Sequence, residues 1–174
     1  MPQMSLPDRI IHTLKCMDRP SDIQPYRDVL AVSRKLPPRE WHELCKLVKT
    51  NRIYNILRTD LSRKEAEVLG SALKKVSLNH VDDMIDVVVK KRDGNAPILL
   101  RYILEKKKKI SVDAVQKYFC EELSRQISLK HLRLLHVMHK NYPSSINSTI
   151  LDFCRSNGHP ICKEILESAM DVVE

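Results

Sequence analysis

A cysteine and histidine pattern near the C-terminal end of the chain has a spacing that could bind a metal ion. Cys154, His159 and Cys162 follow the order C-x4-H-x2-C, and thiolate and imidazole groups are ligands that zinc prefers. A fourth ligand at a fixed spacing is absent, and Cys154 repeats the position of Cys120, each directly after a phenylalanine. Unpaired cysteine is among the residue types most often buried. We therefore predict core cysteines, with no metal ion and no cofactor.

The sequence contains no pattern of a catalytic or nucleotide-binding site. Its three glycines, Gly70, Gly94 and Gly158, are far apart, so no glycine-rich loop can place backbone N–H groups around a phosphate. The three aspartates within residues 82–86 stand at the start of a predicted helix, where the helix dipole favours acidic side chains. We therefore expect a protein that is not an enzyme and has no small-molecule substrate.

Lysines at predicted helix ends are the second group that could bind a ligand. Residues 90–109 hold eight basic and two acidic side chains, whereas the rest of the chain has 22 basic and 20 acidic ones. Alternate antiparallel helices end at the same edge of a stack, so their lysines should form a basic ridge that attracts an acidic partner or a phosphate backbone. The predicted basic ridge consists of Lys74, Lys75, Lys106, Lys107, Lys108, Lys109 and Lys140.

A purely structural explanation of these lysines stays open. Cations at helix C-termini are favoured by the helix dipole by a few tenths to about 1 kcal/mol, without any ligand. The basic residues 90–92 end the preceding helix and are expected at the opposite edge. RNA binding would also require rings that stack on bases, and the candidates beside the ridge are Tyr102, Tyr118 and Tyr142.

Regularly spaced helix starts must position these residues. Ser77, Ser111 and Ser145 stand 34 residues apart, each before an apolar run of helix length, and a period of this size is typical of stacked helix pairs. Ser62 with Glu65 three residues later predicts a capping box. Further predicted starts are Asn95, Ser128 and Pro160.

Composition supports helices throughout the chain. Of 174 residues, 43% are hydrophobic, 5% are aromatic and only 3 are glycine, while leucine, lysine, glutamate and arginine favour helix. We predict an all-α fold, an α-solenoid of about ten or eleven short antiparallel helices with a 34-residue helix-pair repeat. Residues 1–174 would form a single domain, with irregular N-terminal helices in 1–61 and regular helix pairs in 62–174.

Cysteine usage and hydropathy bear on the compartment. The five cysteines form an odd set without the short paired spacing of a disulfide framework, which favours a reducing compartment. No stretch reaches the roughly 18 to 20 apolar residues required to span a bilayer. We predict an intracellular protein, nuclear or cytoplasmic, that does not contact a membrane. The helical sequence at the C-terminal end would fit a fragment of a longer protein.

Two resemblances to known families concern the repeating part. The period and the segments INSTILDFCRSNG and HPICKEILESAM resemble the tetratricopeptide and pentatricopeptide class of helical repeats over residues 77–174. FCRSNGHPICKEILESAM and ILLRYILEKKKKISVDAVQKYFCEEL are similar to helix pairs of the Fanconi anaemia group E helical domain. The pentatricopeptide resemblance implies binding of single-stranded RNA. The second implies a non-catalytic nuclear adaptor within a ubiquitin ligase complex.

The function that these features predict is binding of a macromolecule. We expect a scaffold or adaptor that binds a protein partner and supports the assembly of a larger complex. The alternative is an RNA-binding helical-repeat module that uses the basic ridge. An acidic protein partner and RNA are both anionic, so either could bind the ridge.

Overall fold

The described part of the chain consists of α-helices joined by short turns. The computed structural model describes residues 53–170 except 59, 79 and 107–109, and no strand occurs among them. The helices are α4 (Ile53–Leu57), α5 (Arg63–Lys75), α6 (Val81–Lys91), α7 (Ala96–Leu104), α8 (Asp113–Glu122), α9 (Leu129–Asn141), the 3-10 helix η1 (Pro143–Ser145), α10 (Ser148–Ser156) and α11 (Pro160–Met170). The all-α prediction is confirmed for this part, whereas the helices predicted before residue 53 lie outside the described residues.

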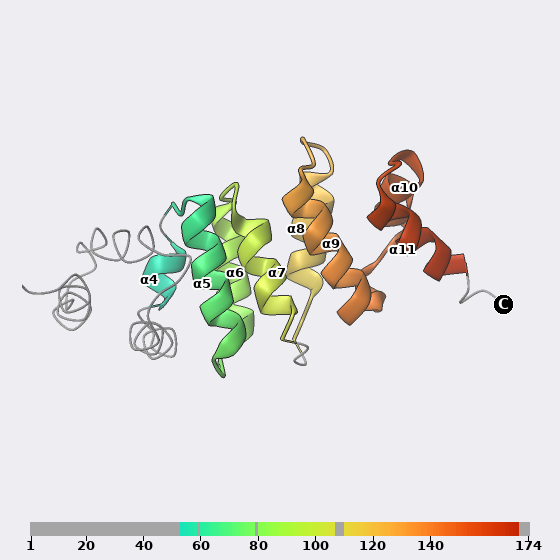
Figure 1. Cartoon of the computed structure of the whole chain (residues 1–174). Coiled ribbons are helices and arrows are strands. Elements are labelled where there is room, and N and C mark those ends of the chain that lie inside the picture. Colours follow the sequence, from blue (N-terminus) through green and yellow to red (C-terminus); the bar gives the residue numbers. More distant parts are fainter. Residues whose placement is uncertain (1–52, 59, 79, 107–109, 171–174) are drawn as a thin grey trace, which may run out of the picture.

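The helices form two layers that lie side by side (Figure 1). In the first layer α5 packs on α7, α7 on α9 and α9 on α11, and in the second layer α4 packs on α6 and α6 on α8. The second layer continues into α10, because the rings of Phe119 and Phe153 meet edge to face with centroids 6.4 Å apart. Two helices that are neighbours in a layer are therefore separated by one other α-helix along the chain.

Four of the predicted helix starts are confirmed. The Glu65 N–H donates to Ser62 Oγ at 3.3 Å and the Ser62 N–H donates to Glu65 Oε2 at 2.6 Å, so the predicted capping box begins α5. Asn95 and Ser128 are the N-cap residues of α7 and α9, and α11 begins at Pro160.

The three serines of the 34-residue pattern stand before helices but do not cap them. Ser77, Ser111 and Ser145 precede the first residues of α6, α8 and α10 by four, two and three positions. The Ser145 hydroxyl instead donates to the Tyr142 carbonyl oxygen at 2.7 Å within η1, and Asn147 caps α10 by accepting from the Ile150 N–H at 3.0 Å. Helix starts in the first layer are 33, 33 and 31 residues apart, so a strict 34-residue repeat stays a prediction.

A continuous apolar core lies between the layers because each helix places leucine, isoleucine or alanine three or four residues apart on one face. Its fully buried side chains include Leu69, Leu73, Leu100, Ile103, Leu104, Phe119 and Leu135. The helices α5 and α7 approach tightly at Gly70, where a Cβ atom would lie 2.8 Å from Tyr102 Cγ. The absence of a side chain at Gly70 thus sets the spacing of these two helices.

Replacing Gly70 by alanine is expected to destabilise the protein by about 1–3 kcal/mol, because the added methyl group overpacks the contact with the Tyr102 ring. This loss should exceed the roughly 1 kcal/mol that alanine gains over glycine in a helix. Urea unfolding followed by circular dichroism measures the difference.

Gly158→Ala is the matched control, since nothing lies within 4 Å of a Cβ atom at Gly158. Its free energy of unfolding should change by no more than about 1 kcal/mol. Equal stability of the two variants would contradict the close packing at Gly70.

Candidate functional site

The predicted basic ridge lies where α5, α7 and α9 end, and Lys106 joins two of these ends. Its ammonium group donates to the carbonyl oxygens of Leu73 and Lys74, each at 2.8 Å, and to that of Val76. Carbonyl groups in the last turn have no partner within their helix, and the negative end of the helix dipole attracts a cation. Lys106 therefore caps α5 from the end of the next helix in the layer.

A carboxylate that the sequence analysis missed lies within the ridge. Lys74 Nζ lies 2.7 Å from Glu105 Oε2, and Glu105 Oε1 lies 3.7 Å from Arg101 Nε. Glu105 stands directly before the lysine run in the sequence, which is the signal that could have placed it here. Its charge lowers the positive potential of the ridge.

The remaining ridge residues differ in what the structure describes of them. Lys75 and Lys140 are exposed in the last turns of α5 and α9, whereas Lys107, Lys108 and Lys109 lie outside the described residues. The structure thus brings Lys74 and Lys106 together in a joint between helices, with Lys75 on the same helix end as Lys74.

A second joint of the same kind connects α9 to α7. Asn141 Nδ2 donates to the Leu104 carbonyl oxygen at 3.2 Å, and Asn141 follows Lys106 by 35 residues along the chain. Both side chains bind the end of the preceding helix of the layer, one of them charged and the other neutral. Capping of the preceding helix is common to both joints, whereas positive charge is not.

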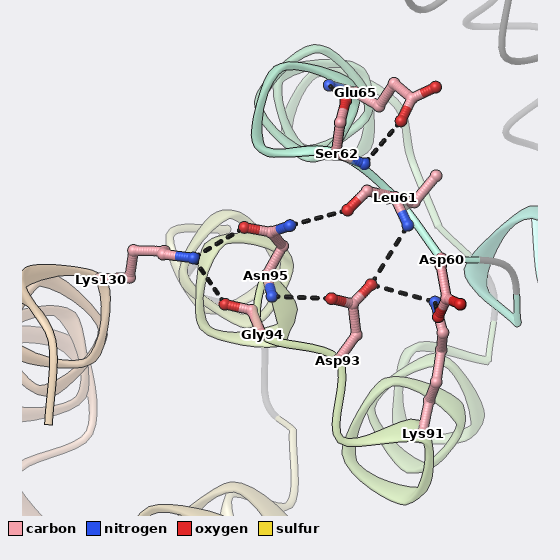
Figure 2. A network of polar contacts seen from close by, with 9 residues as sticks. All are labelled: Asp60, Leu61, Ser62, Glu65, Lys91, Asp93, Gly94, Asn95 and Lys130. Atoms are coloured by element: carbon pink, nitrogen blue, oxygen red, sulfur yellow. Dashed lines mark hydrogen bonds and ion pairs between the residues drawn. The ribbon is translucent and has the colours of Figure 1, made fainter. Parts of the chain in front are cut away.

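A polar network joins the turns at the opposite edge, where α5 and α7 begin (Figure 2). The Asp93 carboxylate accepts hydrogen bonds from the Leu61 N–H at 3.2 Å, the Asn95 N–H at 2.9 Å and the Lys91 ammonium at 3.0 Å. Burial by itself would raise the pKa of Asp93, but these hydrogen bonds outweigh it and lower the pKa below its ordinary value of 3.8.

The same network extends to Lys130 of α9 and includes the basic cluster at residues 90–92. Lys130 Nζ donates to the Gly94 carbonyl oxygen at 2.7 Å and to Asn95 Oδ1 at 2.8 Å (Figure 2). The cluster at residues 90–92 lies at this edge, as predicted, and each of its members has an acidic partner; these are Asp86 for Lys90, Asp60 and Asp93 for Lys91, and Glu121 for Arg92.

The three tyrosines that were candidates for stacking on bases are engaged in packing. Tyr118 is only 3% exposed. Tyr102 donates its hydroxyl to Glu67 Oε2 at 2.8 Å, and the Arg101 guanidinium lies over its ring, 4.4 Å from the centroid. Tyr142 is half-buried, and burial raises its pKa. Tyr102 and Tyr118 therefore do not present an open ring face to a nucleic-acid base.

The two cysteines of the predicted metal pattern lie in the core between α10 and α11. Cys154 and Cys162 are 1% and 0% exposed, which confirms the prediction of buried cysteines. Burial raises the pKa of Cys154 to about 12 and also raises that of Cys162. His159 accepts a hydrogen bond from the Ile161 N–H at 3.2 Å. No group of three or more His, Cys, Asp and Glu residues in the described ranges could hold a metal ion.

Charge segregates between the two layers, a feature that sequence analysis missed. The helices α5, α7, α9 and α11 carry nine Lys and Arg residues against four Asp and Glu residues. The helices α6, α8 and α10 carry four against seven. In α9 three Lys or Arg and three His residues occur without any acid over thirteen residues, which is the sequence signal that could have revealed it.

Comparisons with known proteins leave the chain without an assigned family. No family model matches it, and no curated protein does so either. Within the described residues, every helix is too short or too polar to cross a membrane.

Replacing Lys106 by alanine is expected to lower the free energy of unfolding by about 1–3 kcal/mol, because charge-assisted hydrogen bonds to the end of α5 are lost. Lys140→Ala is the control: Lys140 is exposed on the same edge, and its removal should cost no more than about 0.5 kcal/mol. Urea denaturation measures both. Equal losses would contradict a capping role for Lys106.

Replacing Asp93 by asparagine is expected to cost about 1–3 kcal/mol at pH 7, where the carboxylate accepts its three hydrogen bonds. The pKa of Asp93 is lowered in the folded state, so its stabilisation is present above the unfolded pKa and is lost as the pH falls below 3.8 through the folded pKa. Unfolding midpoints of wild type and variant should therefore converge on acidification.

Asp86→Asn is the control for this pH dependence. It removes an exposed ion pair with Lys90, in which Nζ and Oδ2 are 3.7 Å apart, and should change stability by less than about 0.5 kcal/mol at any pH. A constant difference between wild type and Asp93→Asn from neutral to acidic pH would contradict the role of the ionised carboxylate.

Proposed function

We propose that this protein is a non-catalytic scaffold or adaptor that binds a protein partner and supports the assembly of a larger complex. It acts inside the cell, in the nucleus or the cytoplasm. The proposal includes an α-solenoid of ten or eleven helices with a 34-residue helix-pair repeat, as in the tetratricopeptide class or the Fanconi anaemia group E helical domain. Stacked helices support this, since the hydrogen bonds between units join residues 26 to 37 positions apart.

The observation that carries the proposal is the separation of charge between the layers. A surface built from α5, α7, α9 and α11 has a net positive charge, and the surface of α6, α8 and α10 has a net negative one. Such a distribution orients an acidic partner as it approaches and raises the rate of association. Repeated helices supply the broad surface that a protein partner requires.

RNA binding is the second candidate, and the same positive layer favours it. A single strand gains much of its affinity from bases that stack on aromatic rings. Tyr102 lies beneath Arg101 and Tyr118 is buried, and the carboxylate of Glu105 lies beside Lys74. These features favour an acidic protein over RNA as the ligand.

The test is reconstitution of a complex from purified components. A partner identified by affinity purification should bind the full chain in a two-component titration calorimetry experiment with a dissociation constant of about 10 μM or tighter. A labelled single-stranded RNA should show no saturable binding in that range when titrated at about 50 mM and about 200 mM salt.

Saturable RNA binding that weakens steeply with salt, and that disappears when Lys74 and Lys140 are replaced by glutamate, would favour the RNA module instead. Failure of every purified candidate protein to bind the chain would overturn the scaffold proposal.

A further inference from the structure

A stripe of exposed and half-buried side chains runs along α9, with His136 as its half-buried member. Leu129, Arg133, His136 and Lys140 follow the spacing i, i+4, i+7 and i+11, which places them on one face of an α-helix. We call these four residues the α9 stripe. Among the described residues, Leu129 is the large hydrophobic side chain left exposed, at 50%. The stripe thus combines an apolar end with cationic groups.

Lys130, His131 and His136 of α9 have structural partners. Lys130 donates to the turn between α6 and α7, as described above, and His131 is 7% exposed and accepts from the Ser128 N–H at 3.2 Å. His136 Nε2 lies 3.3 Å from Glu164 Oε1. Arg133 and Lys140 are exposed and make no ion pair within the described part of the chain. They are therefore available to an external anion.

This inference rests on the proposed function and names the surface that serves it. We propose that the α9 stripe is the docking surface for an acidic segment of the partner protein. Carboxylates of that segment bind Arg133 and Lys140, and an apolar side chain covers Leu129. Charge complementarity carries the assignment, because α9 has no acidic residue and its layer is the positive one.

The composition of the stripe selects a protein segment rather than a nucleic acid. Leu129 offers an apolar contact that a phosphate backbone cannot use. Glu164 lies against His136, and Glu105 lies at the end of neighbouring α7, so a continuous line of phosphates across the layer would meet carboxylates. A short protein segment needs carboxylates only at Arg133 and Lys140, and an uncharged residue of it can lie beside His136 and Glu164.

The stripe also sets the length of the segment. Eleven residues separate Leu129 from Lys140, which corresponds to about 16 Å along a helix. About three helical turns, or about five residues of extended chain, span this distance. An acidic helix with glutamates seven residues apart would match Arg133 and Lys140.

The probe is a fluorescein-labelled amphipathic peptide with two glutamates seven positions apart and a leucine four positions from one of them. Its binding is measured by anisotropy with the wild type and with Arg133→Glu/Lys140→Glu. The matched control is Lys117→Glu/Arg155→Glu, which changes the net charge equally but lies on α8 and α10. Circular dichroism and thermal unfolding establish that both variants are folded.

Replacement of the stripe cations should weaken peptide binding about tenfold or more, whereas the control should change it by less than about twofold. A peptide with glutamine in place of glutamate should bind at least about tenfold more weakly, and Leu129→Ser should also weaken binding. Equal effects of the two double variants, or no binding to the wild type at about 100 μM, would overturn the proposal. Preferential binding of a single-stranded RNA with the same dependence on Arg133 and Lys140 would contradict the assignment of a protein segment as the partner.

Failure of this inference is distinct from failure of the proposed function. If a reconstituted protein complex forms equally well with Arg133→Glu/Lys140→Glu and with the control, the α9 stripe is not the docking surface. The proposal of a scaffold then still holds. Absence of any protein complex with the wild type overturns the scaffold, and the peptide titration then decides the stripe by itself.

Discussion

Backbone groups left without partners at helix ends are the constraint on which this arrangement depends. The helices from α5 to α11 have only nine to thirteen residues, so a large share of their N–H and C=O groups lies in first and last turns. Neighbouring helices complete these ends: Lys106 binds the end of α5, and Asn141 binds the end of α7. In the first layer, α5 and α7 are thus each completed by a side chain at or just after the end of the next helix.

The same requirement divides the cations between structure and surface. Lys106 and Lys130 are used where helices or turns of different units meet, and Arg101 binds Glu67 at 3.1 Å across α5 and α7. Arg133 and Lys140 of α9 stay outward, in a layer whose helices carry more basic than acidic residues. Cations that look equivalent in the sequence therefore have different roles, which depend on whether each one reaches the end of a neighbouring helix.

Local signals in the sequence predicted local features well. The Ser62 and Glu65 capping box and the Pro160 helix start depend on residues within one turn, so the sequence alone is sufficient for them. The contact of Lys106 with Leu73 depends on a helix 33 residues earlier, and no local pattern encodes that distance. Ser145 has the type of a capping residue, but its hydroxyl finds a nearer acceptor in Tyr142. Likewise, the acid-free run of α9 is visible in the sequence, but the segregation of charge over whole layers depends on which helices share a layer.

The contacts between helix pairs join residues that are close in the sequence, which affects how the protein folds and unfolds. Contacts between units join residues 26 to 37 positions apart, so closing each unit requires only a small loop and costs little chain entropy. If the predicted helix-pair repeat holds, we expect folding to begin in any unit and spread to its neighbours, and the α10–α11 pair to open while the α5–α7 contact persists. We therefore expect the described helices to open as a linear series of coupled segments rather than as one cooperative unit.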